Sequence, residues 1–336
     1  RQVAKLERQV ALLQRRVLGV SPSAQAPSPK QKVRFVAKGL KSQRSRLGLS
    51  AADYGRLVGV SAQSVYNWEL FFQAPMLIAD RLAKSQRFDD ALRTADNVLT
   101  LKYTVKAIAA QHGLIASFMP KPIFGINGSG MHCHQSVFDQ SGENLFYDAT
   151  DEFHLSKIAY GFIAGQLVHA RALAAVVAPT INSYKRLVPG YEAPVYIGWA
   201  QMNRSALIRI PRYTPGQDKA VRCELRCPDP SCNPYLAFAA MLAAGLDGIG
   251  RNLKPPMPLN NINIYELSAE ERLALSVTEL PGSLDEAMNE LERDEVVKSV
   301  FSPALYSAFI RAKRVEWEDF RIQVTDWELA QFLETA

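Results

Sequence analysis

The sequence predicts an α+β protein in which a large domain of helices and short strands follows a small all-α head. From about residue 88 onward, helical patterns such as that of residues 91–113 alternate with short strand-like stretches. The preceding region instead has a helix-turn-helix pattern between residues 36 and 69. Charge divides the chain in the same way. Residues 1–75 carry a net charge of +10 and the remaining residues a net charge of −4, which together give the +6 of the whole chain.

Length and composition are those of a soluble globular chain with room for one large domain and an appendage. The chain has 336 residues, of which 48% are hydrophobic and 21% charged. No apolar run approaches the roughly 18 residues that a membrane-spanning helix needs, so we expect no membrane partner. The four cysteines suit a reducing compartment and predict a cytoplasmic location. They are Cys133, Cys223, Cys227 and Cys232.

The first 35 residues predict a short coiled-coil helix over residues 1–20 and a linker over residues 21–35. In the helix, valine and leucine alternate at spacings of three and four residues, at Val3, Leu6, Val10, Leu13 and Val17. This seam favours a parallel dimer. An amphipathic helix packed on its own chain is the alternative. The linker is predicted from its proline and serine content.

Residues 36–70 have the pattern of a helix-turn-helix. Ser50 and Asp53 match a capping box, Gly59 suits the tight turn, and Ser61 caps the second helix. The stretch LGLSAADYGRLVGVSAQSVYNWE resembles the Cro/repressor-like regulators. The candidate DNA contacts are Gln63, Ser64 and Asn67 for base edges, and Lys41, Arg44 and Arg46 for phosphates. A small helical bundle that binds no DNA is the alternative, and residues 71–88 are predicted to be a junction.

Helix starts are well marked in the large domain, which we expect to span residues 89–336. Asn233 followed by Pro234 predicts a helix that begins there, and Ser302 followed by Pro303 predicts another. Ser283 with a glutamate three residues later predicts a third. These signals place helices around the strand-like stretches that carry the polar residues.

Two histidines follow a glycine-rich turn in the stretch INGSGMHCHQSVF at residues 126–138. The last eight residues of the stretch predict a strand, in which side chains alternate between faces. His132, His134 and Ser136 therefore share one face, and Cys133 lies on the other. The turn, Asn127 to Gly130, lets the backbone approach a ligand closely. We interpret the histidines as ligand-binding and Cys133 as buried.

Three further stretches offer charged residues. Gly and Pro in NSYKRLVPGYEAP predict a loop that presents Lys185, Arg186 and Glu192. The stretch NRSALIRI adds Arg204 and Arg209. The stretch VRCELRC adds Arg222, Glu224 and Arg226, which strand alternation places on one face. A solvated loop and a salt-bridge ladder are the alternatives. One carboxylate and histidines for a divalent metal, with arginines for anions, match the needs of phosphoryl transfer.

The large domain resembles bacterial type I glutamine synthetase in its catalytic portion. The motifs MPKPIFGINGSGMHCHQSVF, PTINSYKRLVPGYEAPVYIGWA, NRSALIRIP and ELRCPDPSCNPYLAFAAMLAAGLDGI occur in the family's order. The resemblance implies a curved antiparallel sheet flanked by helices and assembly into stacked hexameric rings. It also implies an ATP-dependent reaction of glutamate with ammonia through γ-glutamyl phosphate, with Mg²⁺ or Mn²⁺ as the metal.

The resemblance assigns roles residue by residue. The metal ligands implied are His132 and Glu224; the nucleotide contacts are His134, Ser136, Lys219 and Arg222; the glutamate contacts are Asn127, Gly128, Arg186 and Arg226. Arg204 and Arg209 are implied to stabilise the transferring phosphoryl group, and Glu192 to close the site and help deprotonate ammonium. Tyr265 lies where some members carry a modified tyrosine.

The first 88 residues contain neither the sheet domain nor the three further metal-binding glutamates that the resemblance implies. This leaves three hypotheses open. The chain is an active ligase, or it is a catalytically incomplete synthetase-like domain fused to a DNA-binding regulator head, or its two segments do not work together.

The basic head makes a prediction about DNA binding. In a gel-shift titration with duplex DNA at low salt, the full chain should bind, and the affinity should fall steeply as salt rises because bound counterions are released from the phosphates. Absence of binding at low salt would rule out the regulator hypothesis.

Overall fold

The computed structural model describes Ser50 and residues 89–189, 193–203 and 205–335. Apart from Ser50, these residues belong to one compact unit that spans residues 74–336. Except for Ser50, the predicted coiled coil, linker, helix-turn-helix and junction lie outside the described residues. So do all six candidate DNA contacts, Gln63, Ser64, Asn67, Lys41, Arg44 and Arg46, and these interpretations stay predictions.

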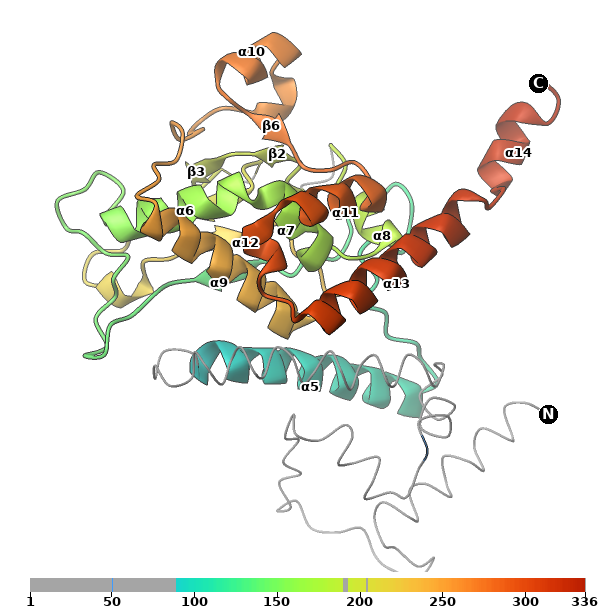
Figure 1. The fold of residues 1–336 in the computed structure, drawn as a ribbon, viewed down its shortest axis with the longest axis horizontal. Helices are drawn as coiled ribbons and strands as arrows, with labels where there is room; N and C mark the ends of the chain where they lie inside the picture. Colours follow the sequence, from blue (N-terminus) through green and yellow to red (C-terminus); the bar gives the residue numbers. More distant parts are fainter. Residues whose placement is uncertain (1–49, 51–88, 190–192, 204, 336) are drawn as a thin grey trace, which may run out of the picture. The chain divides into compact units, whose positions relative to one another are not determined.

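Helices are the main regular structure of the described part (Figure 1). The α-helices are α5 (Asp89–Gln111), α6 (Lys157–Val168), α7 (Ala170–Val177), α8 (Ile181–Arg186), α9 (Pro234–Gly250), α10 (Ala269–Ala274), α11 (Leu284–Arg293), α12 (Glu295–Lys298), α13 (Pro303–Arg321) and α14 (Asp326–Phe332). The 3-10 turns are η1 (Asp218–Ala220) and η2 (Ile264–Glu266). The three predicted starts are confirmed, because the side chains of Asn233, Ser283 and Ser302 cap α9, α11 and α13.

The strands form a four-stranded sheet in the order β1-β5-β4-β3 and a separate pair, β2 with β6. Their bounds are β1 (Cys133–Gln135), β2 (Tyr196–Ile197), β3 (Trp199–Gln201), β4 (Ile208–Ile210), β5 (Cys223–Leu225) and β6 (Thr278–Glu279). The expectation of an antiparallel sheet is wrong at one edge, because β3 pairs with β4 in parallel. The sheet is therefore mixed.

The loop between β3 and β4 explains the parallel pair. Met202, directly after β3, has a left-handed backbone with a φ of 64°, and its N–H donates to the carbonyl of Ile210 in β4 at 3.1 Å. Asn203 then holds the return path, because its side-chain amide donates to the carbonyls of Leu259 and Ile262 and its oxygen accepts from Ser205. The chain thus re-enters the sheet in the direction in which it left.

The close crossing of α6 and α9 forms the centre of the helical layer. At Gly165 an added Cβ would lie 2.1 Å from the backbone oxygen of Ala244, and at Gly248 it would lie 2.1 Å from the oxygen of Gly161. The two backbones touch, so no side chain fits between them. Gln166 on α6 then ties this layer to the sheet, because its amide donates to Gln135 of β1 and to the carbonyl of Met241 on α9.

A buried histidine marks the break between α6 and α7. No single described helix is long and apolar enough to cross a membrane; α6 and α7 meet that test only as a pair, and they bend by 75°. His169 lies at the bend, with Nδ1 2.6 Å from Asp294 Oδ2 and Nε2 3.1 Å from Asp247 Oδ2. It thereby joins the α6–α7 bend to α9 and to the start of α12.

The segment predicted as a loop around Lys185 and Arg186 begins with a short helix, α8. Thr180 and Ser183 form a capping box that starts it. The backbone amide of Ile181 also donates to Glu316 of α13 at 3.1 Å. The proline and glycine that predicted a loop come after α8 in the sequence, so Lys185 and Arg186 lie on a helix, which corrects the interpretation for these two residues.

The glycine contact predicts a steep stability penalty for a single methyl group. Gly165→Ala would drive its Cβ into backbone atoms of α9, which cannot move aside as a side chain can. We expect a loss of about 3 kcal/mol or more in the free energy of unfolding, at the upper range of overpacking effects. Chemical denaturation should show this.

Gly250→Ala is the matched control, because nothing lies within 4 Å of its added Cβ. It should change the free energy of unfolding by less than about 1 kcal/mol. Equal effects of the two variants would contradict the close crossing.

The His169 cluster predicts a pH-dependent contribution to stability. Burial lowers the pKa of His169, but the hydrogen bonds and charges of Asp294 and Asp247 outweigh it and raise the pKa above its ordinary value. A raised pKa in the folded state stabilises the protein fully below the ordinary value of about 6.5, and this contribution is lost as pH rises through the raised pKa. Wild type should therefore lose stability between pH 6 and pH 9 in urea denaturation.

His169→Gln removes the titrating ring and should flatten this part of the pH dependence. It should also cost about 2 kcal/mol at pH 6, the scale of hydrogen bonds to charged groups. The same fall in stability from pH 6 to pH 9 in both proteins would show that His169 is not its source.

Candidate active site

Three residues of the main sheet form one row across adjacent strands. Glu224 of β5 is paired in register with His134 of β1 on one side and with Arg209 of β4 on the other. Directly opposite residues of antiparallel strands project from the same face. The strand alternation predicted for His134 and Glu224 is therefore confirmed, and the sheet adds Arg209 to the same face.

Glu224 is the most buried member of the row, with 1% of its side chain exposed. Arg209 Nε lies 2.5 Å from Oε2, His132 Nδ1 lies 2.9 Å from Oε1, and Arg226 Nε lies 3.6 Å from Oε1. Burial would raise the pKa of the Glu224 carboxyl, but the His132 hydrogen bond and the Arg209 charge outweigh it and lower the pKa to about 2. The carboxylate is thus held ionised in the protein interior.

His132 and Glu224 have the chemistry of two ligands for a divalent cation. A carboxylate oxygen suits Mg²⁺ or Mn²⁺, and an imidazole nitrogen is a common additional ligand. No group of three or more histidine, cysteine, aspartate or glutamate side chains in the described ranges is placed to hold a metal. An ion here would therefore complete its coordination with ligands other than this pair, such as water or phosphate oxygens.

Cys133 does not join this pair. It is 7% exposed, and burial raises the pKa of its thiol to about 12. It stays a neutral core residue on the opposite face of β1, as the alternation predicted.

His134 and Arg222 form a second pair beside the row. Arg222 Nε donates to His134 Nδ1 at 3.2 Å. Burial lowers the pKa of His134, and the charges of Arg222 and Arg209 add to this against the opposing effect of Glu224. The ring is therefore neutral near pH 7 and can accept this hydrogen bond, which leaves Nε2 for another partner.

Arg186 lies against the glycine-rich turn. Its guanidinium donates to the backbone carbonyls of Cys227 at 2.8 Å and Arg226 at 3.0 Å. An added Cβ at Gly130 would lie 2.6 Å from Arg186 Nη2, and one at Gly128 would lie 3.3 Å from its Cγ. The glycines are thus required for this contact. Burial lowers the pKa of Arg186, and only Asp229 and Cys227 oppose this.

The other predicted site residues are less closely joined. Asn127 and Ser136 are exposed, and Lys219 lies in η1 with Nζ 3.9 Å from Glu143 Oε1. Glu192 and Arg204 lie outside the described residues. Tyr265 is half-buried and its hydroxyl donates to the Ala193 carbonyl at 2.7 Å.

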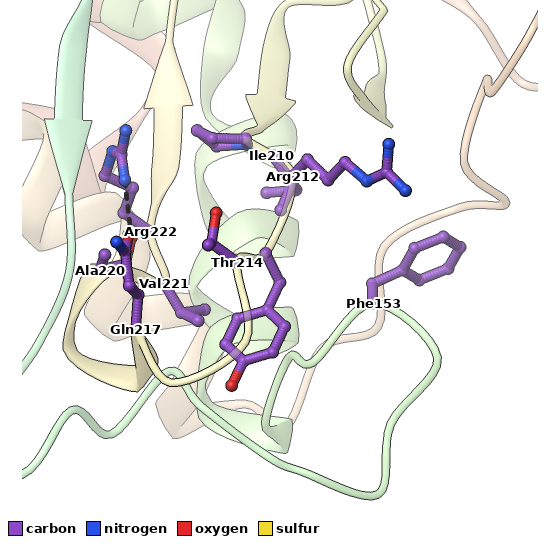
Figure 2. Close-up of a pocket in the computed structure, with 10 residues that line it drawn as sticks. Phe153, Ile210, Arg212, Thr214, Gln217, Ala220, Val221 and Arg222 are labelled. Atoms are coloured by element: carbon purple, nitrogen blue, oxygen red, sulfur yellow. Dashed lines mark hydrogen bonds between the residues drawn. The ribbon is translucent and has the colours of Figure 1, made fainter.

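A pocket of about 120 Å³ lies beside Arg222, under the chain that joins β4 to β5 (Figure 2). Arg222 is the only predicted nucleotide contact in its lining; Arg212, Tyr213 and Gln217 come from the same β4–β5 connection, and Phe153 comes from the segment before α6. Sequence reasoning missed these four residues, because no spacing signal marks a connecting loop that folds over a neighbouring segment. It also missed the buried Lys121, which lies in a motif that was otherwise recognised.

Comparisons with known proteins agree with this geometry. The protein family described as glutamine synthetase, catalytic domain, matches residues 84–332. The glutamine synthetase of Methanocaldococcus jannaschii is 54% identical over 248 residues, covering 74% of this chain and 54% of that protein. The glutamine synthetase of Thermotoga maritima is 53% identical over 247 residues, covering 74% and 55%. The chain therefore spans about half the length of these relatives.

Solved structures are similar as well. A structure of GmaS with ADP has a TM-score of 0.65 at 42% identity, over 73% of this chain and 55% of that one. The Plasmodium falciparum glutamine synthetase has a TM-score of 0.64 at 29% identity, over 72% and 54%. The match over residues 84–332, the identity to these relatives and the shared fold show that the chain belongs to the glutamine synthetase family.

Proposed function

We propose that the chain is the catalytic portion of an ATP-dependent ligase that forms glutamine from glutamate and ammonia through γ-glutamyl phosphate. The single observation that carries this proposal is the buried Glu224 carboxylate, which contacts His132, Arg209 and Arg226 within one face of the sheet. Relatives that are about half identical carry the name glutamine synthetase, and a GmaS structure contains ADP.

The arginines suit a reaction in which a phosphoryl group moves between oxygens. Such a transfer needs positive charge placed in advance around the moving group, because there is little other chemistry for the protein to supply. Arg209 is held at the sheet face by Glu224, and Arg204 would add a second charge. Glu192 would close the site and accept a proton from ammonium. The last two roles rest on the resemblance.

The remaining contacts divide by substrate. We assign ATP to His134, Ser136, Lys219 and Arg222, and glutamate to Asn127, Gly128, Arg186 and Arg226. The Arg186 contact with the glycine-rich turn supports the second group, because it places a buried guanidinium next to Gly130 and the Arg186 stem next to Gly128. A carboxylate is the natural partner of such a guanidinium.

Mg²⁺ or Mn²⁺ would be held by His132 and Glu224, and it would supply charge neutralisation at the phosphates. Because the chain spans about half the length of its relatives, we infer that further ligands come from a portion with no counterpart in this match. We further propose assembly into rings of identical subunits. The four cysteines of the described part are free and buried, which suits a reducing cytoplasm.

Glu224→Gln provides the test of this function. The neutral amide keeps the shape but removes the charge that binds a cation and pairs with Arg209, so γ-glutamyl transfer with Mn²⁺ should fall at least about 100-fold. Mn²⁺–ATP binding, followed by calorimetry, should weaken in parallel, and His132→Ala should weaken it in the same direction.

Glu318→Gln is the control, because Glu318 is an exposed glutamate of α13 that also pairs with an arginine, Arg321. It should leave both measurements unchanged. The proposed function fails for this chain if wild type shows no transfer or glutamine formation above the Glu224→Gln level.

A further inference from the structure

One side-chain amide connects α8 to an extended segment 61 residues earlier in the chain. Asn182 Oδ1 accepts a hydrogen bond from the backbone N–H of Lys121 at 2.7 Å, and Asn182 Nδ2 donates to the carbonyl of Lys121 at 2.9 Å. Lys121 is buried, with 8% exposed. The amide therefore satisfies both backbone polar groups of a buried residue, as a neighbouring strand would.

The same segment holds the glycine-rich turn from two sides. The carbonyl of Pro120 accepts from the backbone N–H of Ser129 at 2.8 Å. The ammonium group of Lys121 donates to the carbonyl of Ile126. The turn that contains Asn127 and Gly128 is thus attached at both ends to residues 120 and 121, and only the Ile126 attachment depends on a side chain.

The other end of α8 contacts this turn directly. Arg186 lies four residues after Asn182, so the two side chains are on one side of the helix. Arg186 packs against Gly128 and Gly130, where an added Cβ would lie 2.2 Å from the Pro120 carbonyl oxygen and 2.6 Å from Arg186 Nη2. The helix therefore meets the turn twice, through Arg186 itself and through Asn182 and Lys121.

We propose that Asn182 and Lys121 are positioning residues that act in series: Asn182 fixes residues 120 and 121 relative to α8, and Lys121 fixes the turn relative to these residues. Together they set the distance between the Arg186 guanidinium and the backbone of Asn127 and Gly128. This inference rests on the proposed function, which places glutamate between these two groups. Nucleotide contacts such as His134 and Arg222 lie on other elements and do not depend on this connection.

The first test measures amide hydrogen exchange in the full chain without substrate. Asn182→Leu and Lys121→Met should each raise exchange in peptides that cover residues 119–131 by about tenfold, the effect of losing one or two hydrogen bonds to buried groups. Exchange in α9 should not change. Asn289→Ala is the matched control, because Asn289 is a half-buried amide on α11 that accepts from Arg314 and lies outside this network.

The second test separates the two substrates. In both variants the apparent KM for L-glutamate should rise about tenfold, whereas the KM for ATP stays within about twofold, which a general loss of structure would not produce. Because the two residues act in series, the double variant should be no worse than the worse single variant.

Each outcome decides a separate point. Unchanged exchange at residues 119–131 in folded variants overturns the positioning role, as does a rise throughout the protein or a multiplicative double variant. If wild type shows no response to L-glutamate, the proposed function fails, while the exchange contrast still decides whether Asn182 and Lys121 position the turn.

Discussion

The buried charge of Glu224 is the interaction on which the rest of the site depends. A carboxylate that is 1% exposed is unfavourable in a protein interior unless it is paired and hydrogen-bonded. Here the partners come from three strands or their ends, His132 beside β1, Arg209 on β4 and Arg226 after β5, so the charge also specifies which strands are neighbours. The need to pair the Glu224 charge therefore determines both the alignment of β1, β5 and β4 and the chemistry of the site.

The elements around this sheet extend the constraint outward. Gln166 connects β1 to α6 and α9, and the glycine contacts fix α6 on α9. His169 then connects the α6–α7 bend to α9 and α12. The positions of these helices relative to the sheet are thus fixed by backbone contacts and paired charges, which have little freedom to adjust.

Short-range chemistry was predictable from the sequence, and long-range pairing was not. The caps at Asn233, Ser283 and Ser302 act within one helical turn, so their letters suffice. The alternation that separates Cys133 from its histidine neighbours is likewise local. The parallel pairing of β3 with β4 depends on Asn203 reaching residues more than 50 positions later, and the α6–α7 break depends on aspartates more than 70 positions later. The Lys121–Asn182 connection is non-local for the same reason.

The crossing of α6 and α9 has a consequence for how this family should be compared. Gly165 and Gly248 have no space for a Cβ, because carbonyl and amide groups of the facing helix occupy it. Any member of the family that keeps this close crossing of α6 and α9 must keep glycine at these positions, whatever reaction it catalyses. Invariant glycines at these positions in an alignment would therefore record a distance between two helices rather than participation in catalysis. Residues that distinguish one activity from another must be sought on the sheet face and its turns.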